Sequence, residues 1–482
     1  MFSSTRLRAC VCAGVASALF LSGSTAKAEI FLVKKEKPTD WEISTNGRVD
    51  AYLNWIGGQT INTGNSGNLV DPTLVCDAMG QNCAPASLDR YILVGPQIGI
   101  RGNPVPNGAM ASTTDDKDLN TFRIRGGFAS TILAFNIYKQ VLPDVKLTIK
   151  LALWAGIQNA YNSGQGFRQF NDAASVDFRE QYMDLSGSWG SVWGGRRIGL
   201  YNRGGMKMDW FLIHQHGVGH PCDVDSSAAA TCGNTGVGSM FPARHAQLGY
   251  ATPDLAGFQL SLAALDPAGV EAANGDRSQW NRTIAPRFEG ELTFRRVMED
   301  RPVGKDEVNL WANGLMQMIG RTAESPRDLS VGDPGVAADA TRSVWGVGGG
   351  AWGRFFGFGL GATGWYGKGL GTAWALGNTA IDNIGELRTH FGYLGAVNYR
   401  ISNFEVAGSY GSTNVKHTAW DEAPTNKLKL SVIKEVRGIG YKLAYHMEPV
   451  VFSIDGMILR YHWHRGEVQN ANTISGGMLA EW

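Results

Sequence analysis

Histidines and aspartates gather in one stretch of the sequence in a pattern that could ligate a metal ion. His214 and His216 are followed by His220, Asp223 and Asp225. Zinc sites built on histidine usually show tighter ligand spacing, and a polar loop would contain the same residue types. We therefore expect no metal here, and no cofactor elsewhere in the chain.

Two further patterns resemble nucleotide-binding or catalytic motifs. Residues 359–364 have G-x-G-x-x-G spacing, but Trp365 and Tyr366 follow where a dinucleotide-binding helix would begin. Glu289 and Glu291 share one strand face and could form a glycosidase pair, although the ionic lining of a wet surface needs the same residues. The sequence contains no G-x-S-x-G, H-E-x-x-H or P-loop pattern. We expect that the protein is not an enzyme.

Composition narrows the class of protein. Among 482 residues, Lys and Arg number 44 and Asp and Glu 43, while 63 residues are Gly and 10% are aromatic. So low a charge density with so many rings argues against disorder. The balanced charge argues against a nucleic-acid partner, which would need a basic surface.

The first 28 residues read as a secretory signal peptide. Arg6 and Arg8 precede an apolar run over 9–21, and Ala26-Lys27-Ala28 is a small-x-small cleavage signal. The mature chain, 29–482, is then exported through the periplasm.

The cysteines of the mature chain support export. They fall into two local pairs, Cys76 with Cys83 and Cys222 with Cys232, in stretches that read as loops. Disulfides closing two small loops fit an oxidising compartment. The alternative is a four-cysteine zinc site, which the spacing disfavours because zinc sites use C-x2-C pairs.

Segments of about ten residues with alternating apolar and polar side chains recur along the mature chain. In Val145–Trp154, for example, Leu147, Ile149 and Leu151 share one face, and Lys146, Thr148 and Lys150 share the other. A period of two with one apolar and one polar face predicts a strand that separates two solvents.

The breaks between these segments alternate between short and long. The short ones are 142–144, 187–190, 253–257, 298–305, 356–357, 401–403 and 447–449, and the long ones are 56–119, 159–175, 202–242, 266–283, 321–341, 369–388, 414–432 and 464–473. The alternation predicts sixteen strands, of which the first spans 43–55 and the last 474–482. Tyr91–Ile100 also reads as a strand, but we assign it to the first long loop.

This organisation predicts an all-β fold, a transmembrane antiparallel β-barrel in a bacterial outer membrane. No apolar run after residue 28 is long enough for a membrane helix. Within lipid only a closed barrel pairs every strand's backbone groups. A soluble sandwich would not need loop lengths to alternate, and a propeller would show a repeat that is missing here. Sixteen strands leave an aqueous lumen.

Aromatic residues gather near the expected strand ends, as in the girdles of outer-membrane barrels. They are Trp55, Trp189, Trp193, Trp210, Phe355, Phe356, Trp365, Tyr366, Tyr399, Tyr461 and Trp463.

Four passages resemble the general, non-specific bacterial porins. Residues 46–52 look like that family's first strand, 122–127 like its second, 179–196 like its fourth and fifth, and 244–258 like the strands after its third loop. The resemblance implies a homotrimeric channel whose third loop, here 202–242, folds into the lumen. It also implies acids on that loop that face arginines on the wall. Position by position, the basic wall is Arg48, Arg123, Arg125, Arg179 and Arg244, and the acidic loop is Asp209, Asp223 and Asp225.

Strand alternation supports part of this assignment. Arg48 shares a polar face with Asp50, and Arg123 and Arg125 lie opposite Phe122 and Ile124. Arg179 and Arg244 instead share the parity of apolar residues, which a bulge or a strand-end position would reconcile. The third loop lacks a Pro-Glu-Phe-Gly-like stretch found in some porins.

We therefore expect an outer-membrane pore for passive diffusion of ions and small hydrophilic solutes. Its partners would be membrane lipid, lipopolysaccharide and further copies of itself. The alternatives are a substrate-selective channel, for example for a sugar, and an enzyme or adhesin on the same barrel.

Overall fold

The chain folds into a single antiparallel β-barrel, seen here in a computed structural model. The structure describes residues 29–37, 40–58, 74–75, 84–85, 119–127, 131–155, 176–209, 233–270, 280–321, 340–377, 379–382, 385–423, 433–464, 466 and 468–482. The predicted signal peptide, the segment Tyr91–Ile100 and all four cysteines of the mature chain lie outside these residues.

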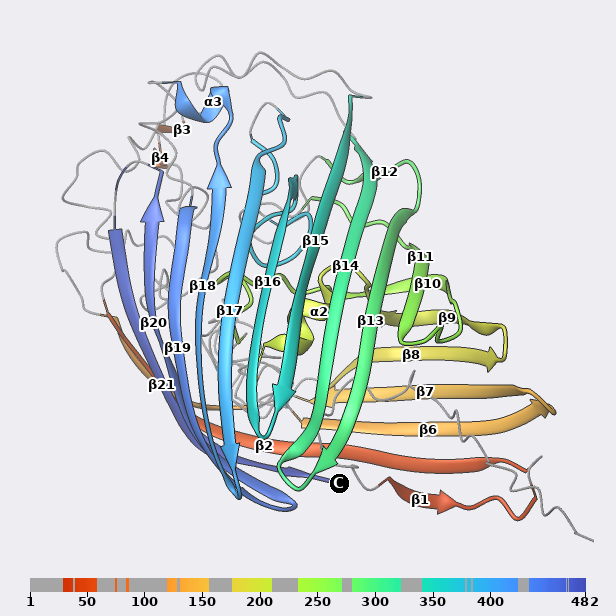
Figure 1. Ribbon diagram of the computed structural model, residues 1–482. Helices are drawn as coiled ribbons and strands as arrows, with labels where there is room; N and C mark the ends of the chain where they lie inside the picture. Colours follow the sequence, from red (N-terminus) through yellow and green to blue (C-terminus); the bar gives the residue numbers. More distant parts are fainter. Residues whose placement is uncertain are drawn as a thin grey trace, which may run out of the picture.

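The strands follow one another along the chain, and the described residues also include two short helices between them (Figure 1). The first half contains β1 (Ile30–Val33), β2 (Glu42–Gly58), β3 (Leu74–Val75), β4 (Ala84–Pro85), β5 (Leu119–Arg125), β6 (Thr131–Leu142), β7 (Val145–Ala155), β8 (Val176–Gly187), β9 (Gly190–Ile198), α2 (Arg203–Met208), β10 (Arg244–Ala251), β11 (Phe258–Leu265) and β12 (Arg282–Thr283). The second half contains β13 (Arg287–Arg301), β14 (Gly304–Gly320), β15 (Thr341–Phe355), β16 (Phe358–Lys368), β17 (Thr389–Ile401), β18 (Phe404–Lys416), α3 (Ala419–Glu422), β19 (Ile433–Met447), β20 (Val450–Trp463) and β21 (Val468–Glu481).

Sixteen strand positions close the wall, as the alternating breaks predict. β5 and β6 together fill the second position, since both pair with β2, one along each half of its length. The last strand, β21, pairs with the C-terminal part of β2, from Arg48 to Gly58, and closes the ring. The short strand β1 continues that edge along the lower half of β2.

The wall has an apolar outer face and a polar inner face. On β7, Leu151 is 41% exposed whereas its neighbour Lys150 is 6% exposed, and on β19 Leu443 is 50% exposed beside Ala444 at 1%. Alternation along each strand therefore turns one set of side chains toward lipid and the other toward the interior.

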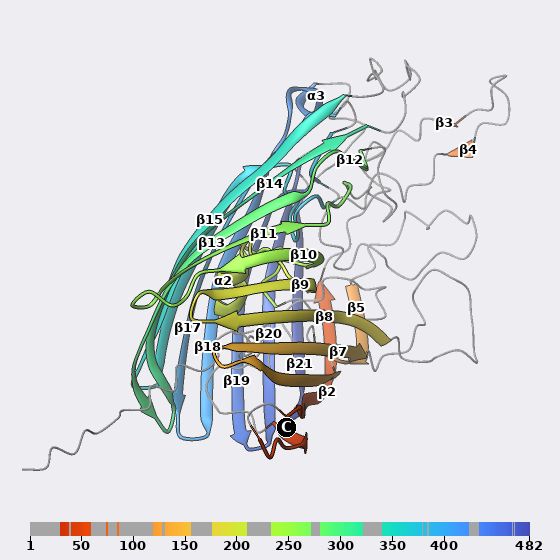
Figure 2. The same cartoon turned by 90° about the vertical axis from the view of Figure 1, so that its right-hand side faces the viewer.

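Turns and loops also follow the predicted alternation, with three adjustments. The short break predicted at 298–305 is only 302–303, because β13 and β14 stay paired until Arg301 meets Gly304. The first strand, predicted at 43–55, spans Glu42–Gly58, and the last, predicted at 474–482, begins earlier, at Val468. Trp482 follows that strand, and its backbone exchanges two hydrogen bonds with Gly47 of β2. Figure 2 places this C-terminal end beside β2.

The aromatic residues divide between the two faces. Trp189 and Tyr250 stack on the outer surface with ring centroids 6.5 Å apart, and Phe356 and Tyr399 are also exposed. Trp193, Trp365 and Tyr461 are instead buried on the inner side. Assigning these three to an interfacial girdle was wrong. Side chains alternate between the two faces of a strand, and it is their neighbours, such as Val192 and Tyr366, that point outward.

Neither helix among the described residues is long and apolar enough to cross a membrane. α2 lies inside the ring of strands, behind β15 and β16 in Figure 1, and contacts both. An apolar cluster fills the space between this third-loop region and the wall. Its members include Tyr201 and Met240 from the loop and Leu315, Val344 and Trp365 from the strands.

Candidate functional site

Charged side chains on the inner faces of β7, β8 and β10 form a connected group. Lys150 Nζ lies 2.9 Å from Glu180 Oε2, and Arg244 Nε lies 3.5 Å from Glu180 Oε1. The Arg244 guanidinium also lies 4.1 Å from the centroid of the Trp154 ring. All four side chains are largely hidden on the inner side of the wall, where the single carboxylate of Glu180 contacts two cations.

Arg179 reaches the same group through a β-bulge. The register between β7 and β8 pairs Ala152 with Glu180 and Leu153 with Phe178, and thus leaves Arg179 as the extra residue. Its guanidinium lies 4.8 Å from the Trp154 ring, which faces inward. Arg244 reaches the ring because it is the first residue of β10. A bulge and a strand end thus account for the two irregular parities in the predicted basic wall.

The remaining members of the predicted basic wall lie on β2 and β5. Arg48 is 5% exposed, and its Nη1 lies 3.8 Å from Glu481 Oε1 on β21. Arg123 and Arg125 occupy strand positions paired with Asn54 and Tyr52, but their side chains lie outside the described part of the chain.

Glu289 and Glu291 hold the beginning of the third long loop. Glu289 Oε2 accepts hydrogen bonds from the backbone N–H groups of Leu200 and Tyr201, at 2.6 and 3.0 Å. Glu291 Oε2 accepts from Arg203 Nε at 2.9 Å, in an ion pair that also includes Arg203 Nη2. Both carboxylates therefore serve as loop anchors on the inner face of β13. The sequence predicted that the two carboxylates share one strand face, but it did not predict which residues they bind.

Asp209 ties the two described ends of this loop together. Its carboxylate accepts hydrogen bonds from Asn234, one from the backbone N–H at 2.6 Å and one from Nδ2 at 2.8 Å. Asp209 and Asn234 are both fully buried. The predicted acids Asp223 and Asp225 lie outside the described residues, as do His214, His216, His220 and the cysteines Cys76, Cys83, Cys222 and Cys232.

The returning segment of the loop rests on the inner faces of β16 and β18. Gly238 donates its N–H to Thr413 Oγ1 at 2.8 Å, and its carbonyl accepts from Trp365 Nε1 at 3.0 Å. Ser409 Oγ donates to Asn234 Oδ1 at 3.0 Å. Val237 packs into an apolar cluster with residues of β19, β20 and β21. Residues 233–240 thus contact strands far around the ring from β9 and β10, which flank the loop.

A second buried ion cluster went unnoticed in the sequence. Glu405 Oε2 lies 2.9 Å from His446 Nε2, Glu405 Oε1 lies 3.7 Å from Lys442 Nζ, and Asn398 Nδ2 donates to Glu405 at 3.0 Å. All four residues occupy inward positions of β17, β18 and β19. In the sequence, the only indication of their inward direction is that they alternate with apolar residues, which are exposed in the structure.

The loop end of the wall carries a third group, around α3. Arg388 Nε and Nη2 bind the Asp421 carboxylate at 2.7 and 2.8 Å. Burial raises the pKa of Asp421, but the hydrogen bonds and the positive charge of Arg388, together with a backbone hydrogen bond from Thr418, outweigh it and hold that pKa below its usual value. Burial also raises the pKa of Asp382, which accepts from Thr418 Oγ1 at 2.6 Å. These contacts join the segment before β17 to the segment after β18.

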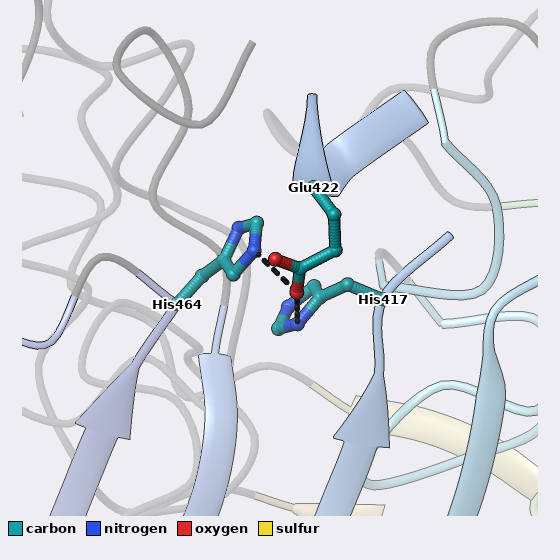
Figure 3. Close-up of side chains that lie close together, drawn as sticks. All are labelled: His417, Glu422 and His464. Carbon is teal, nitrogen blue, oxygen red and sulfur yellow. Dashed lines mark hydrogen bonds and ion pairs between the residues drawn. The ribbon is translucent and has the colours of Figure 1, made fainter. Parts of the chain in front are cut away.

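Two histidines lie beside this group. The rings of His417 and His464 stack with centroids 3.8 Å apart, and Glu422 Oε1 contacts a nitrogen of each ring (Figure 3). Burial, together with the adjacent His464, lowers the pKa of His417 well below its usual value. The imidazole of His417 is therefore neutral at physiological pH.

The comparisons with known proteins agree with this architecture. The sequence matches the family model for the Gram-negative porin over residues 13–477. The chain belongs to the Gram-negative porin family. It is an outer-membrane channel for passive diffusion. The match covers nearly the whole barrel, including the strands on which the resemblance to porins rested.

Two solved porin structures share the fold. The outer membrane channel DcaP of Acinetobacter baumannii gives a TM-score of 0.57 at 14% identity, over 93% of this chain and 99% of that one. An anion-selective porin from Comamonas acidovorans gives 0.51 at 10% identity, over 92% and 100%. No curated protein matched the sequence.

Proposed function

We propose that the third long loop, 202–242, narrows the lumen of this porin and sets its size limit. The support comes from Gly238, whose N–H and carbonyl both bind inner-wall side chains, on β18 and β16. The loop begins at anchors on β13 and passes back over strands on the far side of the ring. A segment held at both places reduces the cross-section open to solutes.

We further propose that the arginines of the inner wall bias ion passage. Arg48, Arg179 and Arg244 are inward or stacked on an inward ring, and the positions of Arg123 and Arg125 pair with inward residues of β2. The opposing acids would be Asp209, Asp223 and Asp225, with Glu180 already in contact with Arg244. Fixed charges across a narrow aqueous path orient dipolar solutes and change the local concentration of each ion.

The reversal potential in a salt gradient tests this assignment. We expect Arg179→Ala combined with Arg244→Ala to shift the channel toward cations, because two inward positive charges are lost. Arg301→Ala is the matched control, since Arg301 lies at the turn end of β13 and contacts Phe356 there. An unchanged reversal potential in the double variant would remove these arginines from the selectivity path.

The finer assembly is also a proposal. Family membership supports a homotrimer embedded among lipid and lipopolysaccharide. We propose no catalytic role, because Glu289 and Glu291, the suggested glycosidase pair, both bind the third loop. Disulfides between Cys76 and Cys83 and between Cys222 and Cys232 remain part of the proposal. Cross-linking of the refolded protein in detergent tests the trimer, and a monomer under all conditions would contradict it.

A further inference from the structure

Three potential metal ligands meet at the loop end of the barrel. His417 follows the last residue of β18, Glu422 ends α3, and His464 follows the last residue of β20. Glu422 Oε1 lies 3.0 Å from His464 Nε2 and 4.0 Å from His417 Nδ1. One donor atom from each residue lies within 4.8 Å of the other two. Figure 3 shows the contacts of the carboxylate with both rings.

The surrounding contacts fix the backbone that carries these side chains. Thr418 forms a capping box with Asp421 at the start of α3, and the Asp421 carboxylate is bound by Arg388. Thr418 Oγ1 also donates to Asp382. His417 and Glu422 are therefore held on either side of a braced helical turn, which limits the entropy lost when both bind one ligand.

The three candidate ligands differ in their exposure to solvent. The side chains of His417 and His464 are each 2% exposed, whereas that of Glu422 is 51% exposed. Two shielded imidazoles provide strong nitrogen donors, and the exposed carboxylate leaves a route from solvent. Because His417 and Glu422 follow β18 and His464 follows β20, the ligands come from two different loops.

The donor set selects the class of ion. Two imidazoles with one carboxylate suit zinc and neighbouring transition metals, whereas calcium and magnesium prefer all-oxygen sites. Zinc bonds of about 2.1 Å in a tetrahedron separate the donor atoms by about 3.4 Å. The two separations from Glu422 Oε1, 3.0 and 4.0 Å, lie on either side of that spacing, and the two histidine donors lie within 4.8 Å of each other. Coordination also requires the stacked rings to splay by rotation about their Cβ–Cγ bonds, so that both lone pairs converge.

We propose that His417, Glu422 and His464 bind one divalent transition-metal ion of the zinc class at the outer mouth of the channel. Three protein ligands leave a fourth position for water. The bound ion ties the segment after β18 to the segment after β20. It thereby restrains two loops that border the entrance of the pore.

Metal titration of the untagged full-length protein, refolded in detergent, tests the proposal. Zn²⁺ binding is followed by calorimetry, and Co²⁺ replaces Zn²⁺ to give the absorption bands of a low-symmetry nitrogen–oxygen site. We expect one strong site, and an affinity reduced by at least about 100-fold in His464→Gln and in Glu422→Gln. Loss of a group that merely supports a ligand costs about 10–100-fold. Glu422→Gln keeps the shape of an exposed side chain, so folding is maintained.

Two controls separate this site from other histidines. His462→Gln removes a histidine on β20 outside the cluster, and a triple variant replaces His214, His216 and His220 by Gln. Both should bind Zn²⁺ as tightly as the parent. Absence of Zn²⁺ binding in the parent overturns the proposal. So does binding that survives in Glu422→Gln and His464→Gln, or that disappears in the triple variant alone.

Discussion

Arg203 of α2 and Glu291 of β13 illustrate how single charged residues inside the barrel tolerate burial. The pair is almost completely hidden from solvent, and two guanidinium nitrogens reach the same carboxylate oxygen. Removing one partner of such a pair leaves an uncompensated charge, which is more costly than removing both.

A double-mutant cycle on this pair measures the coupling. We expect Arg203→Gln to destabilise the barrel by about 3–5 kcal/mol, because Glu291 stays charged and buried. Adding Glu291→Gln should recover most of that loss. Thermal unfolding followed by circular dichroism provides the measurement. If the two substitutions simply add, Arg203 does not balance Glu291.

Asp209 gives a second prediction for a single residue. Asp209→Asn replaces a charged acceptor of two hydrogen bonds from Asn234, and should cost about 1–3 kcal/mol and loosen the base of the third loop. We expect noisier open-channel current at unchanged barrel content. Asp254→Asn, in the short turn before β11, is the control. Equal noise in the two variants would argue against Asp209 as the tie.

The sequence predicted the direction of side chains, inward or outward, well at regular strand positions and poorly at irregular ones. Alternation predicted the inward direction of Arg48 and the outward direction of Leu151. It could not locate the bulge that turns Arg179 inward, because a bulge depends on the pairing with β7. Trp193 and Trp365 were misplaced for a related reason: an aromatic near a strand end also fits an inward cluster.

At the scale of elements, glycines on the wall and in the third loop let the loop and the wall approach each other closely. A Cβ at Gly361 of β16 would lie 2.7 Å from Met208 Sδ of α2. Gly238 has φ +88°, and a Cβ there would lie 2.1 Å from the backbone oxygen of Tyr393. The glycine-rich strands therefore form a surface on which the loop packs closely. In the sequence, these glycines are visible only as an unusually high glycine content.

Alanine substitution tests this close packing. Gly238→Ala should displace residues 233–240 from the wall, because the positive φ and the backbone contact both oppose a side chain. We expect a lower unfolding temperature and an altered conductance. Gly395→Ala on β17 is matched to it, since a Cβ there meets nothing within 4 Å. A Gly238→Ala channel with parental conductance and stability would contradict the packing described.

Element lengths were predictable where the pattern alternated, and the loop paths were not. Six of the seven short breaks coincide with the turns of the structure, because a turn interrupts the apolar period directly. The position of residues 233–240 depends on distant partners such as Thr413 and Trp365, more than a hundred residues away in sequence. Local pattern carries no information about such contacts.

At the scale of the whole molecule, closure explains the composition. The ring pairs the backbone of its first and last strands, β2 and β21, so that no edge is exposed to lipid. Only alternate residues need to be apolar, which is why 43% hydrophobic residues suffice for a membrane protein. Many charged residues face the interior, where they form buried pairs such as Lys150 with Glu180 and Lys442 with Glu405.

Planar-bilayer recording of the mature chain, 29–482, refolded in detergent, tests the central claim most directly. A water-filled barrel should produce discrete conductance steps that increase in proportion to salt concentration, without turnover or an added ligand. Saturable block by one solute would instead indicate a selective channel. A protein that inserts without any conductance steps would contradict an open aqueous path through the barrel.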